Sequence, residues 1–199
     1  MATVNGTLNQ DTWLNGNAPT TNNNSSGSMT VGDSAGNDKA RAVLKFTMPA
    51  NPGGGTITKI EVGLYNTSAN GAGSYDVNLY QGTSTPATTW VDSQATWDIY
   101  KTSNNWTAAG GASDYSATII DSFARPFTTS VYSYWVIQGT GATNPLSLTW
   151  GDTVNLLVRA PSSTGNNDFF QDSGAANPPV LIVTYTAVLN IPDARVFFM

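Results

Sequence analysis

Short runs in which apolar and polar residues alternate constrain the fold of this chain more than any other feature. In the run from residue 59 to 65, Ile60, Val62 and Leu64 occupy every second position. A period of two places such side chains on one face of a β-strand, whereas a helix would need a period of about 3.6, which the chain nowhere sustains. Further strand-like runs occur at residues 41–46, 75–80, 146–150, 154–158 and 180–185.

Turn-forming residues separate these runs. Residues 49–55 and 162–167 are rich in Pro, Gly, Asn and Ser, and we find no internal repeat and no linker between two domains. Many short strands with turns between them are typical of a sandwich or jelly roll. The sequence therefore predicts an all-β fold, a single jelly-roll-type antiparallel β-sandwich over residues 1–186. Residues 187–199 would form an apolar C-terminal extension, either an edge strand or a docking arm.

The residue inventory argues against catalysis. The chain contains no histidine and no cysteine, and Glu61 is its only glutamate. Most side chains that act as general bases, nucleophiles or transition-metal ligands are thus missing. Glycoside hydrolysis by two carboxylates would remain open to the aspartates, but nothing in the sequence singles out such a pair. We therefore expect no enzymatic activity.

Charge and hydropathy exclude two classes of partner. The 13 acidic and 8 basic residues give a net charge of −5, and no Lys/Arg cluster offers a footprint for nucleic acid. No apolar stretch approaches the roughly 20 residues of a membrane-spanning helix. Charged residues make up only 11% of the chain, so neutral polar groups must cover its surface. We expect neither nucleic-acid nor membrane partners.

The two ends of the chain suggest where the protein acts. The first residues lack the basic and apolar regions of a secretory signal, so no signal peptide is visible. We expect a location on a virion or an extracellular surface. The apolar C-terminal residues predict contacts with other virion or surface subunits, in a homo-oligomer. The residues expected at this interface are Val188, Leu189, Ile191, Val196, Phe197 and Phe198.

Several segments occur in an order that resembles a known family. They include Asp-Thr-Trp at residues 11–13, Arg-Ala-Val-Leu-Lys-Phe at 41–46, Trp-Val-Asp-Ser-Gln-Ala-Thr-Trp at 90–97 and Phe-Gln-Asp-Ser at 170–173. Over residues 11–186 the chain resembles the DNRLRE-domain proteins and related carbohydrate-binding modules of bacterial polysaccharide-degrading enzymes. It departs from their pattern at Asp92, where the family has Glu. The resemblance implies a jelly-roll sandwich, secreted or on a surface, without catalysis.

Two functional hypotheses follow. The first is a non-catalytic structural or decoration protein on the outer surface of a particle, most plausibly a phage-like virion, which assembles with neighbouring subunits. It rests on the neutral surface, the missing signal and the apolar C-terminal residues. The alternative is a carbohydrate-binding module or adhesin of a secreted or cell-surface protein, with glycans as partners. It rests on the family resemblance and on aromatic residues in loops.

Trp106 is the principal candidate for contact with a ligand. It lies in the polar segment 102–107, and an exposed indole would offer a flat apolar face to a sugar ring. Tyr100 and Tyr115 are weaker companions. Packing in the core is the alternative for Trp106, and it is the favoured role of the tryptophans beside strand-like runs. Those tryptophans are Trp90, Trp97 and Trp150.

Asp11 and Asp172 are the candidate metal ligands. They lie near opposite ends of the chain, but a jelly roll can bring its first and last strands together. Calcium prefers carboxylate oxygens, supplemented by backbone carbonyls and Asn. The pair therefore predicts one structural Ca2+. The alternative is that each aspartate caps a turn through backbone N–H groups.

Overall fold

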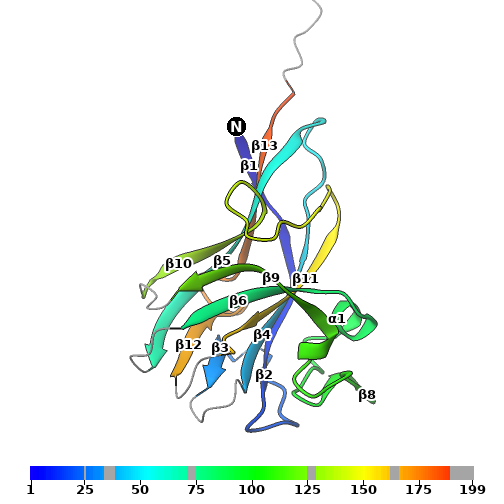
Figure 1. The fold of residues 1–199 in the computed structure, drawn as a ribbon, viewed down its shortest axis with the longest axis vertical. Coiled ribbons are helices and arrows are strands. Elements are labelled where there is room, and N and C mark those ends of the chain that lie inside the picture. The colour runs from blue at the N-terminus through cyan, green and yellow to red at the C-terminus, as the bar shows by residue number, and fades with distance from the viewer. Residues whose placement is uncertain (25, 34–38, 71–74, 125–128, 162–165, 189–199) are drawn as a thin grey trace, which may run out of the picture.

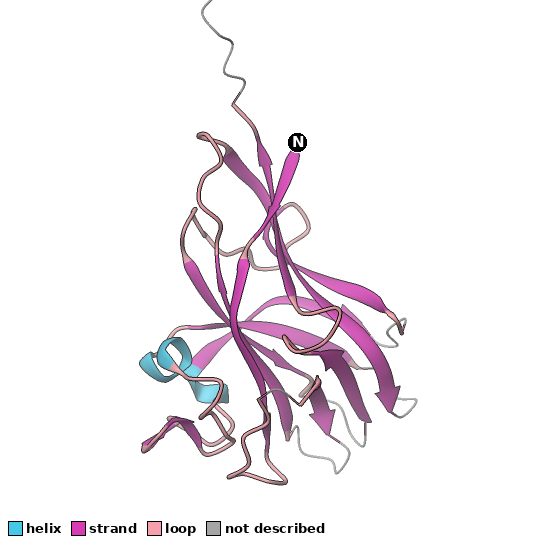
Figure 2. Cartoon of the chain, turned by 180° about the vertical axis from the view of Figure 1, so that it is seen from behind, coloured by secondary structure: helices cyan, strands magenta, loops and turns pink. Residues whose placement is uncertain are grey.

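The computed structural model of the 199-residue chain describes residues 1–24, 26–33, 39–70, 75–124, 129–161 and 166–188. Strands dominate these residues, with one short α-helix and one 3-10 helix among them (Figures 1 and 2). In chain order the elements are β1 (Ala2–Asn5), β2 (Thr7–Asn15), β3 (Ser28–Asp33), β4 (Ala40–Thr47), β5 (Thr56–Asn70), β6 (Asp76–Gly82), α1 (Thr85–Thr89), β7 (Ile99–Lys101), β8 (Asn104–Asn105), η1 (Ala112–Asp114), β9 (Tyr115–Ala124), β10 (Val131–Gly139), β11 (Thr153–Arg159), β12 (Asn166–Gln171) and β13 (Val180–Thr186).

All strands except β7 and β8 join one curled antiparallel sheet. Its order is β1-β13-β5-β12-β3-β4-β11-β6-β9, with β10 also paired to β5 and β2 to β4. The sheet forms two layers (Figure 1). The back layer contains β10, β5, β13 and β1, the front layer contains β2, β4, β11, β6 and β9, and β12 and β3 connect them. The predicted all-β, jelly-roll-type sandwich is confirmed.

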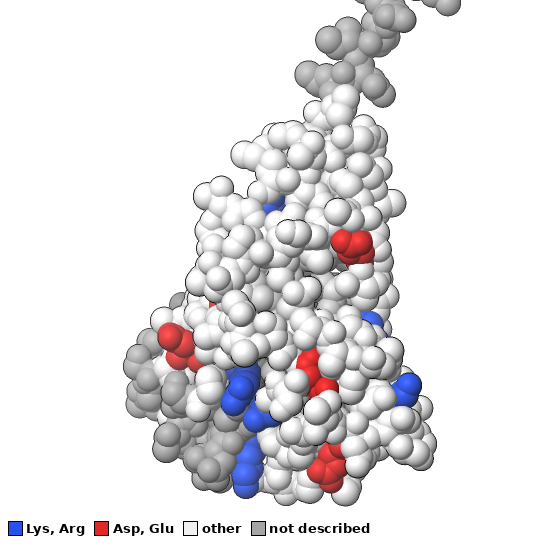
Figure 3. Space-filling model, turned by 45° about the vertical axis from the view of Figure 1, so that its right-hand side comes forward, with Lys and Arg blue, Asp and Glu red and all other residues white. Residues whose placement is uncertain are grey.

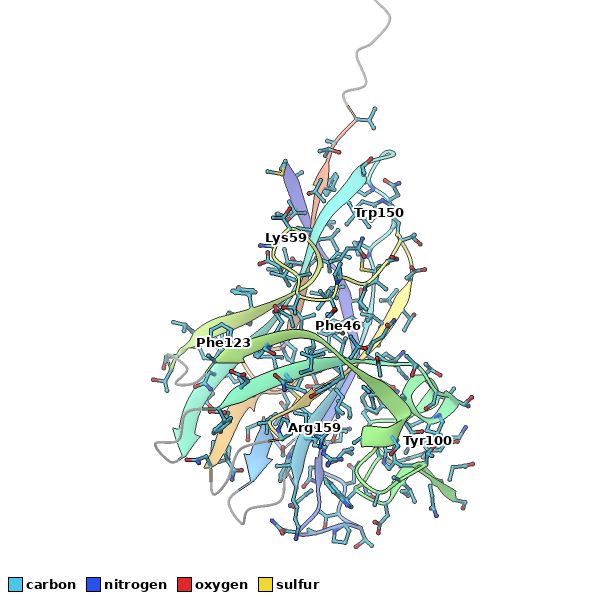
Figure 4. All side chains as sticks on the ribbon, in the orientation of Figure 1. Phe46, Lys59, Tyr100, Phe123, Trp150 and Arg159 are labelled. Atoms are coloured by element: carbon cyan, nitrogen blue, oxygen red, sulfur yellow. The ribbon has the colours of Figure 1, made fainter. Side chains whose placement is uncertain are left out.

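The main hydrophobic core lies between the two layers. Ile60, Val62 and Leu64 point into it from the back layer, as their alternation predicts, and Phe46 enters from the front layer (Figure 4). Trp135 on β10 crosses the core, since its indole N–H donates to the Val77 carbonyl of β6 at 3.0 Å. This bond satisfies the single polar group of a fully buried side chain.

A second hydrophobic cluster lies on the outer face of the front layer. Val43, Tyr80 and Leu157 point away from the main core and are nevertheless buried. Residues 83–114, which contain α1, β7, β8 and η1, cover them; we call this segment the cap. A strand that is buried on both faces reads as consecutive apolar residues, as Leu-Leu-Val at 156–158 does. Trp90 of the cap is fully buried here, as expected for a core tryptophan.

One expected strand is absent. Residues 146–150 alternate as a strand would, but the structure places them in an irregular segment. The side chain of Gln138 binds this segment in the way a neighbouring strand would, because its amide donates to the Leu148 carbonyl and accepts from the Leu148 N–H. Leu146, Leu148 and Trp150 still pack against the main core. Their alternation reflects burial on one side without pairing along the backbone.

The predicted interface falls mostly outside the described residues. Of its six members the structure describes Val188, which is 56% exposed. The other five lie in residues 189–199, outside the described part of the chain. The docking role of this segment and the boundary at residue 186 stay predictions. No helix within the described ranges is long and apolar enough to span a bilayer.

Candidate functional site

Asp114 holds the two ends of the cap together. Its carboxylate is fully buried and accepts hydrogen bonds from the Ser84 hydroxyl at 2.8 Å and from the N–H and hydroxyl of Thr107 at 2.9 and 2.5 Å. Ser84 also caps α1 by accepting from the Ala87 N–H. One carboxylate thus joins the beginning of the cap to its later part, which fixes the loops between them.

A stacked cation holds the same segment from a second side. The guanidinium of Arg41 lies 4.6 Å from the centre of the Trp97 ring and donates to the Gly110 carbonyl at 2.8 Å. Such contacts between Arg and an indole stabilise structure most when both groups are shielded from water. Arg41 is nearly buried, so this pair helps to hold the cap in one position.

The cap and the turn after β2 enclose a cleft of about 510 Å3. This volume lies within the roughly 300–1,000 Å3 of small-molecule sites. Ile99, Ala108 and Ala109 give the cleft an apolar side, while Asp98 and Asn105 supply exposed polar groups. The full set of lining residues is Thr20, Thr96, Asp98, Ile99, Asn105, Trp106, Thr107, Ala108 and Ala109.

Trp106 lines this cleft but is only 4% exposed. Its indole N–H donates to the Thr96 carbonyl at 2.9 Å, and its ring centre lies 5.7 Å from that of Tyr100. The polar neighbours of Trp106 in sequence suggest an exposed ring, but the cap turns the indole inward onto the second cluster. Trp106 therefore forms a wall of the cleft, with little of its face open to a ligand.

The other two aromatic candidates lie apart from the cleft lining. Tyr100 is buried in the cap next to Trp106 and lies to the lower right in Figure 4. Tyr115 borders a different hollow of about 430 Å3, which Tyr80 and Arg159 also line. Burial, and secondarily the negative charge of Asp114, raises the pKa of the Tyr115 hydroxyl far above its usual range. The structure thus brings Trp106 and Tyr100 together and leaves Tyr115 beside a separate surface.

The structure brings Asp11 and Asp172 together, as the sequence predicts. Both are almost fully buried. Asp11 Oδ2 accepts from the Ser173 N–H at 2.7 Å, while Asp172 accepts from the N–H groups of Gly27 at 2.7 Å and Gly174 at 2.9 Å. The two carboxylates therefore tie the first long strand to the loop after β12 and to the start of β3.

Burial leaves Asp11 incompletely satisfied. Desolvation raises the pKa of its carboxyl group; the hydrogen bonds from Ser173 oppose the rise, and the negative charges of Asp172 and Asp92 add to it. Oδ1 of Asp11 is buried without a hydrogen-bond partner. An orphaned carboxylate oxygen beside a second carboxylate suits a cation chemically, since buried charges are normally paired. Among the described residues, however, no group of three or more Asp, Glu, His or Cys side chains could hold a metal.

Three tyrosines on the outer face of the back layer were not among the predicted site residues. We call Tyr65, Tyr132 and Tyr134 the tyrosine face. The ring centres of Tyr65 and Tyr132 lie 5.3 Å apart in an edge-to-face contact, and those of Tyr132 and Tyr134 lie 5.8 Å apart in a stacked one. The spacing of two residues between Tyr132 and Tyr134 could have revealed that they share one face of a strand.

The fold defines the class of protein, and the sequence comparison defines the family. A jelly-roll-type β-sandwich is an architecture shared by viral capsid and lectin domains, so the fold by itself admits both functional hypotheses. The model of carbohydrate-binding module family 96 matches residues 2–185, and the chain belongs to this family. The carbohydrate-binding part of the expected resemblance is thereby confirmed, whereas the DNRLRE name is not. No curated protein matches the chain.

Proposed function

We propose that this protein is a non-catalytic carbohydrate-binding module and that the cleft beside Trp106 receives part of a glycan. The proposal is carried by one observation: a chain of a carbohydrate-binding family has a cleft at the tryptophan that the sequence singles out. The chain belongs to a family of carbohydrate-binding modules, and a cleft of about 510 Å3 is lined by the tryptophan singled out from the sequence. The match favours the carbohydrate-binding hypothesis and gives no support to a decoration protein of a virion.

The cleft offers a sugar both of the surfaces that it needs. The apolar side made by Ile99, Ala108 and the edge of Trp106 suits the C–H groups of a sugar ring. Asp98 and Asn105 are exposed and can bind hydroxyl groups. Cleavage of a glycosidic bond would require two carboxylates across that bond, and Asp98 is the single carboxylate among the lining residues. The chemistry of the cleft therefore favours binding without turnover.

Neutral side chains cover most of the surface. On the face shown in Figure 3 the acidic side chains lie apart from one another, and several basic side chains lie close together near its lower end. With a net charge of −5, the chain would repel a polyanion at long range.

Action on a virion or an extracellular surface and assembly through residues 187–199 remain predictions. Deleting these residues and measuring the sedimentation coefficient tests the assembly: a homo-oligomer should become a monomer.

A variant that fills the cleft tests the proposed site without removing a core residue. Ala109 is exposed at the cleft, so Ala109→Trp should occupy the space of the ligand. We expect glycan-array binding by the natural protein and at least a tenfold loss of affinity in Ala109→Trp by calorimetry. Ala50→Trp, at an exposed alanine outside the cleft lining, is the matched control and should bind normally. Equal binding by both variants would contradict the assignment of the cleft.

We also propose that Asp11 and Asp172 hold one calcium ion. The support is the orphaned Oδ1 of Asp11 beside a second buried carboxylate; backbone carbonyls and water would complete the ligands. Thermal unfolding with calcium and with a chelator tests this. Calcium should raise the Tm of the natural protein and leave that of Asp11→Asn unchanged. A Tm that does not respond to calcium would show that the pair acts only by accepting the three backbone N–H groups.

A further inference from the structure

We propose that the tyrosine face is a second carbohydrate-binding surface, separate from the cleft, which binds an extended uncharged polysaccharide chain. It depends on the proposed function only for the class of ligand, because the surface itself is defined by its own geometry. The cleft lies beside the cap on the front layer, whereas Tyr65, Tyr132 and Tyr134 belong to β5 and β10 of the back layer.

The register of β5 and β10 explains why three rings gather here. Tyr132 pairs with Tyr65, and Tyr134 pairs with Gly63. Gly63 has no side chain, so the ring of Tyr134 lies over its backbone: a Cβ atom at Gly63 would come within 2.6 Å of Tyr134 Cε1. The missing side chain leaves room for Tyr134 to stack on Tyr132. The outcome is a row of rings along a sheet face, in contrast to the enclosed Trp106.

The central ring of the row is held in place. The hydroxyl of Tyr132 donates to the Pro178 carbonyl at 2.9 Å. A tyrosine hydroxyl is a proton donor at neutral pH, and burial, followed by the proximity of Tyr134 and Tyr65, raises the pKa of this hydroxyl further. A ring fixed by a hydrogen bond and by two neighbours loses little conformational entropy when a ligand stacks on the surface.

Exposure on this face is unusual for the molecule. Tyr134 is 40% exposed and is one of four large hydrophobic residues that stand out as exposed in the described chain, the others being Val131, Met1 and Val188. Val131 alternates with Tyr132 along β10 and therefore belongs to the opposite face of the strand. The contacts between the three tyrosine rings make this face an apolar cluster, and such clusters mark contact surfaces, whereas scattered single residues do not. Tyrosine rings combine an apolar face with a hydroxyl, which suits a polyhydroxylated chain.

The charge of this face selects the kind of polysaccharide. On β5 the outward positions preceding Gly63 are Lys59 and Glu61, and these two form an ion pair with 2.7 Å between Nζ and Oε1. The pair neutralises itself, and the neighbouring strand β13 presents Val180 and Ile182 towards this side. Among the described residues of this ion pair and of the three rings no cation is in surplus, so a uronic-acid or sulfated polymer would find no counter-charge from them. An uncharged chain is the complementary ligand.

Binding to insoluble polymers with matched variants tests the proposal. The probes are microcrystalline cellulose, a β-mannan and a β-1,3-glucan, with alginate as the charged comparison. We expect the natural protein and Tyr134→Phe to bind at least one uncharged probe equally well, because the ring is retained. Tyr134→Ala should weaken that binding at least tenfold. Val131→Ala, which shortens an equally exposed side chain on the opposite face of β10, is the matched control and should bind normally; circular dichroism checks that all variants fold.

The outcomes separate this surface from the cleft. If Ala109→Trp loses binding while Tyr134→Ala binds normally, the tyrosine face is not a binding surface and the cleft assignment stands. If the reverse holds, the tyrosine face is the site and the cleft assignment fails. Failure of the natural protein to bind any uncharged probe would overturn the proposal. It would also be overturned if sedimentation equilibrium showed a dimer that Tyr134→Ala dissociates, because the face would then bind a second copy of the chain.

Discussion

The two outer faces of the sandwich differ in a way that separates structural from ligand-binding aromatic residues. On the front layer, the cap covers the outward side chains of β4, β6 and β11. Trp90, Tyr100 and Trp106 of the cap are buried in this contact. On the back layer, no described segment packs over Tyr134, which stays exposed on a paired strand. An aromatic residue in a polar loop can therefore be structural, whereas one on a regular strand can face the solvent.

The difference also concerns what each face can bind. The covered face gains a cleft where the cap meets the turn after β2, so it can enclose part of a ligand. The open face offers a row of rings and can contact a chain along its length. Substitutions in the cap, on the open face and at the aspartate pair test this comparison. We expect their effects on the free energy of unfolding to decrease in that order.

The largest effect is expected when the hydrogen bonds inside the cap are removed. Asp114→Ala removes a buried carboxylate that accepts three hydrogen bonds. Bonds to a charged acceptor contribute about 1.5–3 kcal/mol each in mutational series, with strong overlap between neighbours. We expect the free energy of unfolding to fall by about 3 kcal/mol in urea titrations. Asp98→Ala, an exposed carboxylate of the same segment, is the control and should change stability by less than about 0.5 kcal/mol.

A moderate effect is expected on the open face. In Gly63→Ala the new methyl group would meet Tyr134 at 2.6 Å and Val180 at 2.8 Å. Overpacking of this kind costs about 1–3 kcal/mol, and the displaced ring should lower binding of the uncharged polymers while leaving the cleft intact. Depletion assays and urea titrations measure both quantities. Because the ring is part of the clash, Gly63→Ala should cost less in a Tyr134→Ala background; an equal cost would place the strain elsewhere.

The smallest effect is expected at Asp11 and depends on pH. Its folded-state pKa is raised above the usual 3.8, chiefly by burial. The folded state therefore binds the proton more tightly than the unfolded state, and stability falls as the pH rises from 3.8 through the raised pKa. Asp11→Asn carries no charge, so we expect this part of the pH dependence to be absent in calcium-free buffer. The measurement is the free energy of unfolding of the natural protein minus that of Asp11→Asn, determined at several pH values in this range. A difference that does not change with pH would rule out the raised pKa.

The sequence predicts the architecture of this protein better than its binding surfaces. The alternation of Ile60, Val62 and Leu64 specifies which face of β5 is buried, because burial of one face is the physical cause of the pattern. The approach of Asp11 to Asp172 follows from the closure of a sandwich. Exposure is harder to predict, because whether Trp106 faces solvent depends on how the whole cap folds back. Tyr134 is open for the converse reason, since no later segment returns to cover it among the described residues.

Titration calorimetry tests the central claim most directly, since one trace distinguishes binding from turnover. Soluble oligosaccharides from the uncharged polymers would be injected into the natural protein. Our account predicts heats that saturate at a fixed ratio of ligand to protein and return to baseline after each injection. A steady heat that persists while substrate remains would reveal hydrolysis, and the absence of any saturable heat would show that this chain does not bind these glycans. Either result would contradict a non-catalytic carbohydrate-binding module.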